Sequence, residues 1–221
     1  MSTLFRIVFI SALLSSLYVG MVAASTTPLE RGIAALQRND LVNAIKILQP
    51  LAARGDVQAQ YYLGLSYEYR PEAVAWFKKA SEQGHAKAQY FLYSFYRDGM
   101  GVEQNPLLAN HWLNKAAVGG SDSAQYSLGI ESGDPKWFRL AAAQGHDGAQ
   151  LALASLYRDG KGVERDFVRA YMWLYLAAEA GNASAKEERA EAEKQVLTTQ
   201  EIKQGRALAQ RCKQSGFKHC D

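Results

Sequence analysis

The stretch AQLALASLYRDGKGVERDFVRAYMWLYLAAEAG, residues 149–181, decides the fold of this 221-residue chain. Ala149, Leu153 and Tyr157 recur every four residues, which places them on one side of a first helix. Two glycines then end that helix, because glycine adopts backbone angles that other residues avoid. A second helix carries apolar residues on one face: Ala170, Trp173 and Ala177. A single hairpin of this kind cannot bury its apolar face, so the stretch predicts further copies.

Glycines that recur along the chain mark these copies: Gly55, Gly84, Gly120, Gly145, Gly181 and Gly216. We number positions from these turn glycines. Alanine lies at position +4 after the first five, and glutamine lies at position +5 after the first four. All four tryptophans lie eight residues before a turn glycine: Trp76, Trp112, Trp137 and Trp173. This spacing predicts tandem helical hairpins whose length varies only in one surface loop.

The pattern resembles the SEL-one-like repeat family, a branch of the tetratricopeptide class of helical repeats. Its motif, approximately A-x-x-x-L-G-x-x-Y-x-x-G-x-G-V-x-x-D-x-x-x-A-x-x-W-x-x-x-A-A-x-x-G, is matched by Ala149, Leu153, Tyr157, Gly160, Gly162, Val163, Asp166, Ala170, Trp173, Ala177, Ala178 and Gly181. Residues 88–120 match nearly as well, with Tyr93 at a motif glycine and Asn105 at the motif aspartate. The resemblance covers about residues 29–221. It implies an all-α, right-handed solenoid of antiparallel helix pairs, with about 12 helices.

Residues 1–24 have the features of a secretory signal peptide. Arg6 precedes a long apolar run, and Val22-Ala23-Ala24 supplies small residues for cleavage. A retained membrane anchor is the alternative, because the run approaches the length of a bilayer span. We expect cleavage after Ala24, a single solenoid domain over residues 25–221 with atypical first and last repeats, and a periplasmic or secreted protein without a membrane span.

Composition and motifs indicate no catalytic site, metal or cofactor. The formal net charge of +3 is spread along the chain, which gives no footprint for nucleic acid. The Gly-x-Gly segments at 99–101 and 160–162 follow helices, whereas phosphate-binding loops follow strands. The four histidines lack a two-ligand spacing, and two cysteines cannot make a four-ligand zinc site.

The family resemblance implies a protein–protein interaction scaffold, with an envelope protein or peptide as the expected partner. A passive assembly spacer is a second possibility. A third comes from secreted, cysteine-rich members of the family, which are associated with penicillin binding and weak β-lactamase activity. Those members carry a Cys-x7-Cys pair in repeat after repeat, whereas this chain has one such pair and no S-x-x-K motif.

The two cysteines, Cys212 and Cys220, flank Gly216. They hold the positions that alanines hold around earlier turn glycines, as Ala80 and Ala88 do around Gly84. Such alanines are expected to face each other across the turn. We therefore expect a disulfide, formed in an oxidising compartment. Two free thiols in a terminal tail are the alternative.

Positions +4, +8 and +12 form the packed stripe of each first helix, so positions +6, +9 and +13 point to the opposite side. Position +6 is tyrosine on three helices and then Leu151, +9 includes one tyrosine, and +13 includes two arginines; tyrosine and arginine are the residue types that dominate binding hot spots. We expect a concave partner-binding face formed by Tyr61, Tyr90, Tyr93, Arg97, Tyr126 and Arg158. The rival interpretation is that the tyrosines pack between neighbouring repeats.

The signal peptide leads to a direct test. The protein recovered from an envelope fraction should have the intact mass of a chain that starts at Ser25. Full-length protein embedded in the inner membrane would contradict cleavage after Ala24.

Overall fold

The computed structural model describes residues 27–68, 70–218 and 220. The predicted signal peptide and its cleavage site lie outside these residues. Within the described ranges the chain forms twelve α-helices and one π-helical turn, and no strand. The all-α helical repeat fold expected from the sequence is confirmed. None of the helices in these ranges is both long and apolar enough to cross a bilayer.

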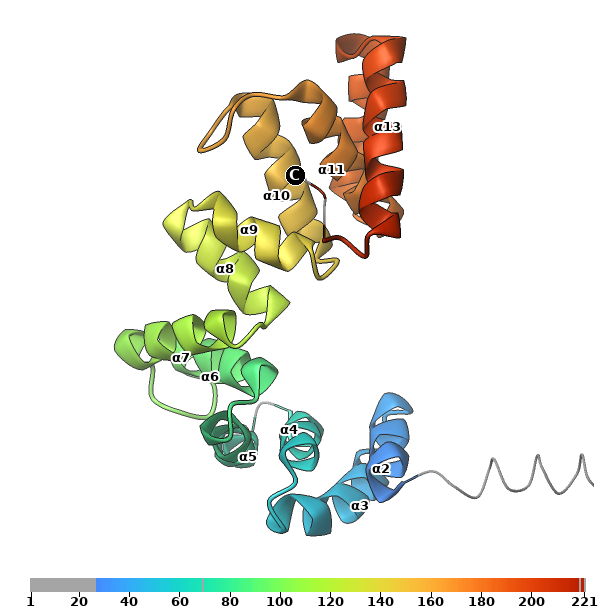
Figure 1. Cartoon of the computed structure of the whole chain (residues 1–221). Helices are drawn as coiled ribbons and strands as arrows, with labels where there is room; N and C mark the ends of the chain where they lie inside the picture. Colours follow the sequence, from blue (N-terminus) through green and yellow to red (C-terminus); the bar gives the residue numbers. More distant parts are fainter. Residues whose placement is uncertain (1–26, 69, 219, 221) are drawn as a thin grey trace, which may run out of the picture. The chain divides into compact units, whose positions relative to one another are not determined.

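The chain divides into two compact units, and the boundary along the sequence follows Gln83. The first unit contains α2 (Pro28–Gln37), α3 (Leu41–Ala53), α4 (Val57–Ser66) and α5 (Pro71–Glu82). The second contains α6 (Ala86–Asp98), α7 (Pro106–Val118), α8 (Asp122–Ser132), α9 (Pro135–Ala142), α10 (Asp147–Asp159), α11 (Phe167–Glu179), α12 (Ala183–Glu191), the π turn η1 (Ala192–Val196) and α13 (Thr199–Gln214). Within each unit, consecutive helices pack against each other as far as α12, whereas α13 packs against α11 (Figure 1). The expectation of a single solenoid domain stays a prediction.

Local sequence signals set the helix ends. Proline occupies the first turn of α5, α7 and α9, where the backbone amide has no intrahelical partner to lose. Gly99 and Gly160 end α6 and α10 in the left-handed conformation. Thr198 and Glu201 form a capping box at the start of α13, as their spacing predicts.

The packed stripe lies where the repeat pattern places it. The alanines at position +4 are all fully buried: Ala59, Ala88, Ala124, Ala149 and Ala185. Leu63, Leu92 and Leu153 at position +8 are buried beside them. Small side chains at +4 let the paired helices approach closely, and the leucines fill the space next to that contact.

A buried glutamine joins the two helices that flank a turn. Gln60, Gln125 and Gln150, all at position +5, donate from Nε2 to a backbone carbonyl eight residues earlier, at distances of 3.1, 3.1 and 3.4 Å. The accepting residues, Ala52, Ala117 and Ala142, lie near the end of the preceding helix. Because the glutamines are at most 5% exposed, each bond is shielded from water.

A disulfide links the end of α13 to the residues that follow it. Cys212 and Cys220 form the expected disulfide, with their Cα atoms 4.7 Å apart. Cys212 is fully buried against the core of the second unit, which includes Ala177 and Ala209. The bond therefore ties the end of the chain to the last helix, where an uncovered repeat would otherwise expose its apolar face.

Position +9 varies together with one residue of the second helix. Gly129 faces the ring of Phe138, and a Cβ built on Gly129 would lie 2.8 Å from it. Gly64 faces Phe77 in the same way, at 2.7 Å. In the hairpins of α6 with α7 and of α10 with α11 the glycine is replaced, by Tyr93 and by Ala154, and the phenylalanine is a leucine, Leu113 or Leu174. Gly64 and Gly129 are therefore required because a phenylalanine ring occupies the space that a Cβ atom would take.

Gly129→Ala tests this pairing. The added methyl should lower the free energy of unfolding by about 1 kcal/mol, the difference between a mid-range overpacking cost of about 2 kcal/mol and a helix-propensity gain of about 1 kcal/mol. Adding Phe138→Leu to the same variant should recover part of the loss in a denaturant titration. A Gly129→Ala protein as stable as the wild type would contradict the pairing.

Candidate binding face of the first helices

The residues predicted to bind a partner differ in exposure. Helices α4, α6, α8, α10 and α12 are the first helices of their hairpins. Tyr61 on α4 and Tyr93 on α6 are buried, at 9% and 4% exposure. Tyr90 and Tyr126 are half-buried, and the two arginines, Arg97 and Arg158, are exposed.

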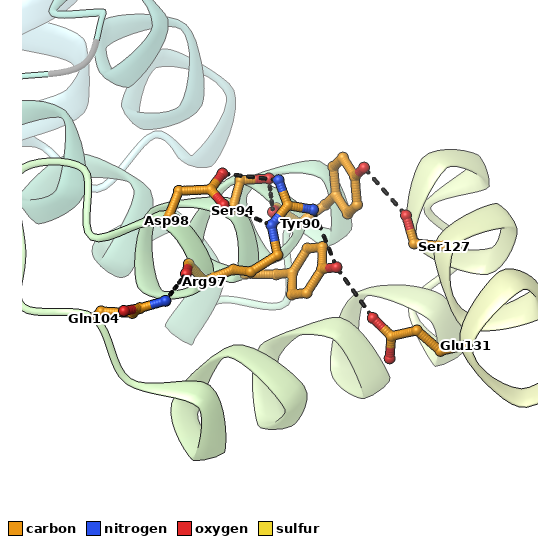
Figure 2. A network of polar contacts seen from close by, with 8 residues as sticks. Tyr90, Ser94, Arg97, Asp98, Gln104, Ser127 and Glu131 are labelled. Carbon is orange, nitrogen blue, oxygen red and sulfur yellow. Dashed lines mark hydrogen bonds and ion pairs between the residues drawn. The ribbon is translucent and has the colours of Figure 1, made fainter.

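Polar bonds join α6 to α8 across this face. The hydroxyl of Tyr93 donates to Glu131 Oε1 (3.1 Å), and the hydroxyls of Tyr90 and Ser127 lie 3.3 Å apart. Figure 2 shows Tyr90 directed toward Ser127 on the neighbouring helix, and Arg97 turned toward Asp98. These bonds fix the spacing of the two first helices.

Arg97 lies at the edge of the same network. It donates to the Tyr93 hydroxyl (3.2 Å) and makes two bonds to Asp98, at 2.7 and 2.8 Å. The bonds to Asp98, with that to Tyr93, raise the pKa of the guanidinium, and burial raises the pKa of Tyr93. Arg97 therefore presents a permanent charge in a fixed orientation while half of its side chain stays exposed.

Arg158 holds the equivalent position on α10 and makes equivalent bonds. It pairs with Asp159 (3.0 Å) and, across to α12, with Glu188 (3.1 Å). Its pKa is raised, first by the hydrogen bond to Asp159. Position +13 thus carries an exposed guanidinium, next to an aspartate, at the end of both α6 and α10.

Tyr126 contributes to packing. Its ring stacks on His146 with centroids 4.6 Å apart and meets Phe138 edge-on. His146 caps α10 by accepting from the Ala149 amide. Tyr126 therefore supports the start of the next first helix and leaves only part of its surface to solvent.

The expectation that the whole tyrosine row faces solvent is wrong for Tyr61 and Tyr93. Tyr61 packs on Tyr62 and Phe77, and Tyr93 is enclosed by the next first helix. Counting residues around one helix identifies the face but not the neighbour that covers it. The rival interpretation, packing between repeats, describes Tyr93, whereas Tyr61 packs on its own helix and on α5 of the same hairpin. Partner binding at Tyr90, Arg97, Tyr126 and Arg158 stays a prediction.

A second polar cluster, absent from the sequence predictions, lies at the C-terminal end. Glu193 on the π turn accepts from the Tyr171 hydroxyl and from Arg206 (3.0 Å), and Arg206 also donates to Tyr171 (3.0 Å). These bonds, led by the one from Tyr171, lower the pKa of Glu193. The charged run at 186–196 predicts one solvated helix, whereas α12 ends at Glu191 and the wider turn brings Glu193 to Tyr171.

No metal-binding cluster is found in the described part of the chain, where no three His, Cys, Asp or Glu side chains gather suitably. The arrangement on the first helices is one of exposed cations and partly covered aromatic rings on a fixed frame. Such a surface can bind another polypeptide.

Comparison with known proteins identifies the repeat. A sequence model of the Sel1 repeat matches residues 57–85, 86–121, 136–146 and 148–182, together half of the chain. The chain belongs to the Sel1 repeat family.

Two solved structures share its fold. A Sel1 repeat protein from Oxalobacter formigenes is 33% identical, with a TM-score of 0.63 over 67% of this chain and 48% of that one. The protein c5321, a protective antigen present in uropathogenic Escherichia coli strains and displaying an SLR fold, is 27% identical, with a TM-score of 0.62 over 80% of this chain and 43% of that one. This chain thus spans less than half the length of either relative.

Proposed function

We propose that this protein is an exported, non-enzymatic scaffold that binds a partner protein or peptide through the predicted concave face of its first helices. A helical scaffold of Sel1 repeats fits a role in protein interaction generally. The main support for partner binding through this particular face is the pair of arginines at position +13. Arg97 and Arg158 are each held by a neighbouring aspartate, so a partner carboxylate meets a charge that is already oriented.

Export has two further supports. The Cys212–Cys220 disulfide fits an oxidising compartment, because cytosolic thiols are kept reduced. The relative c5321 is a protective antigen, a property that suits a protein reached from outside the cell. Together with the predicted signal peptide, these points favour the periplasm or the cell exterior.

The variant Arg97→Ala/Arg158→Ala tests the binding face. We expect it to recover at least about tenfold less partner than the wild type from an envelope extract, since arginine hot spots cost more than about 1 kcal/mol each. Quantitative mass spectrometry measures the recovery. The fold should survive, because exposed ion pairs contribute less than about 1 kcal/mol.

The matched control removes two exposed cations elsewhere, Lys78 on α5 and Arg211 on α13. Lys78→Ala/Arg211→Ala should recover the partner as the wild type does. If the arginine variant keeps the partner, or if both variants lose it equally, the assignment to this face is wrong.

A further inference from the structure

A cavity of about 150 Å³ opens between α10, α11, α12 and the π turn of the second unit. Its apolar wall is formed by Ala154, Ala170, Leu174 and Ala192. Phe167 and Val196 also line it while remaining 41% and 63% exposed, which is unusual for such large apolar side chains. Arg158 and Glu188, which join α10 to α12, belong to the same lining.

The cavity follows from the residue pair at position +9 and on the facing second helix. In two hairpins a phenylalanine ring lies against glycine, and in a third Tyr93 and Leu113 belong to the same buried cluster. In the hairpin of α10 and α11 both members are small, Ala154 and Leu174. The space that one aromatic ring takes in those three hairpins is therefore left open here. Apolar cavities of about 150 Å³ in other proteins hold a benzene ring.

The charges around the cavity favour a cation beside that ring. Arg158 is already engaged by Asp159 and Glu188, at 3.0 and 3.1 Å. Glu191, also in the lining, is exposed and makes no hydrogen bond or ion pair with any side chain in the described ranges. Glu191 is therefore the carboxylate of this lining that is available to a ligand cation, while about half of the Arg158 side chain stays exposed.

We infer that this cavity is a recognition pocket for an aromatic side chain of a partner peptide, next to a lysine or arginine that pairs with Glu191. The inference rests on the proposed scaffold function and specifies its partner. The ring enters between Ala154 and Leu174, and in doing so covers the exposed parts of Phe167 and Val196. The adjacent cation remains at the surface, where its charge stays hydrated.

The peptide acetyl-Phe-Lys-Lys-amide tests the pocket directly by NMR of the methyl groups. We expect saturable shifts at Ala154, Leu174 and Ala192 within roughly 10 mM peptide, the weak end of measurable affinity. Acetyl-Ala-Lys-Lys-amide should bind at least tenfold more weakly because it lacks the ring. Acetyl-Phe-Glu-Glu-amide should also bind at least tenfold more weakly because it repels the carboxylates.

Two variants fill the cavity with rings that the chain uses elsewhere. Ala154→Phe and Leu174→Phe should each abolish the shifts. If Ala154→Phe does not fold, Leu174→Phe provides the same test. Leu140→Phe, at a 42% exposed position on α9, is the matched control and should bind as the wild type does. No shift in the wild type, unchanged binding by a folded filled variant, or equal binding of the acidic peptide would overturn the proposal. Because the peptide is added directly, such a failure leaves the partner capture through Arg97 and Arg158 unaffected.

Discussion

The buried glutamine after a turn is the contact on which the stacking of hairpins depends. It bonds back to the preceding helix, and in two cases it also accepts from a glutamine that precedes the following turn: Gln83 bonds to Gln60 and Gln144 to Gln125, both at 2.8 Å. One side chain thereby connects three consecutive helices. The other two glutamines lack this donor, because Gly119 and Ala180 stand at the donor position for Gln89 and Gln150, and Gln150 Oε1 has no hydrogen-bond partner in the described structure. The C-terminal helices are stabilised instead by the disulfide and by the Tyr171–Glu193–Arg206 cluster.

A repeated frame of this kind lets individual positions change without loss of the fold. Positions +4, +5 and +8 carry the packing and the glutamine bond, so they stay alanine, glutamine and leucine on α4, α6, α8 and α10. Position +9 varies between glycine, tyrosine and alanine, and its partner on the second helix varies between phenylalanine and leucine. The pair decides whether the space between helices is filled by a ring or left open. Binding specificity can therefore arise from two residues while the rest of the hairpin is unchanged.

The sequence alone gives the helices, their ends and the buried stripe, because those features depend on residues near one another in the chain. Proline at helix starts, the capping box at Thr198 and the pairing of Cys212 with Cys220 are examples. It does not give the burial of Tyr93, which depends on contact with Glu131 thirty-eight residues away. Nor does it give the π turn, since one additional residue in a helical turn leaves no mark on the charged pattern of residues 186–196. Which side chains of the predicted face reach solvent therefore required the structure, and partner binding at this face stays a prediction.

Replacing Gln125 with methionine tests the dependence on the buried glutamine most directly. The variant keeps the length of the side chain and removes the bond to Ala117 inside the core of the second unit. Its free energy of unfolding, from a urea titration, should fall by about 1–3 kcal/mol, the usual cost of a lost buried hydrogen bond. Gln144→Met removes only the second, partly exposed bond and should cost less than about 0.5 kcal/mol, as most surface substitutions do. Equal stabilities for Gln125→Met and the wild type would contradict the role assigned to this glutamine.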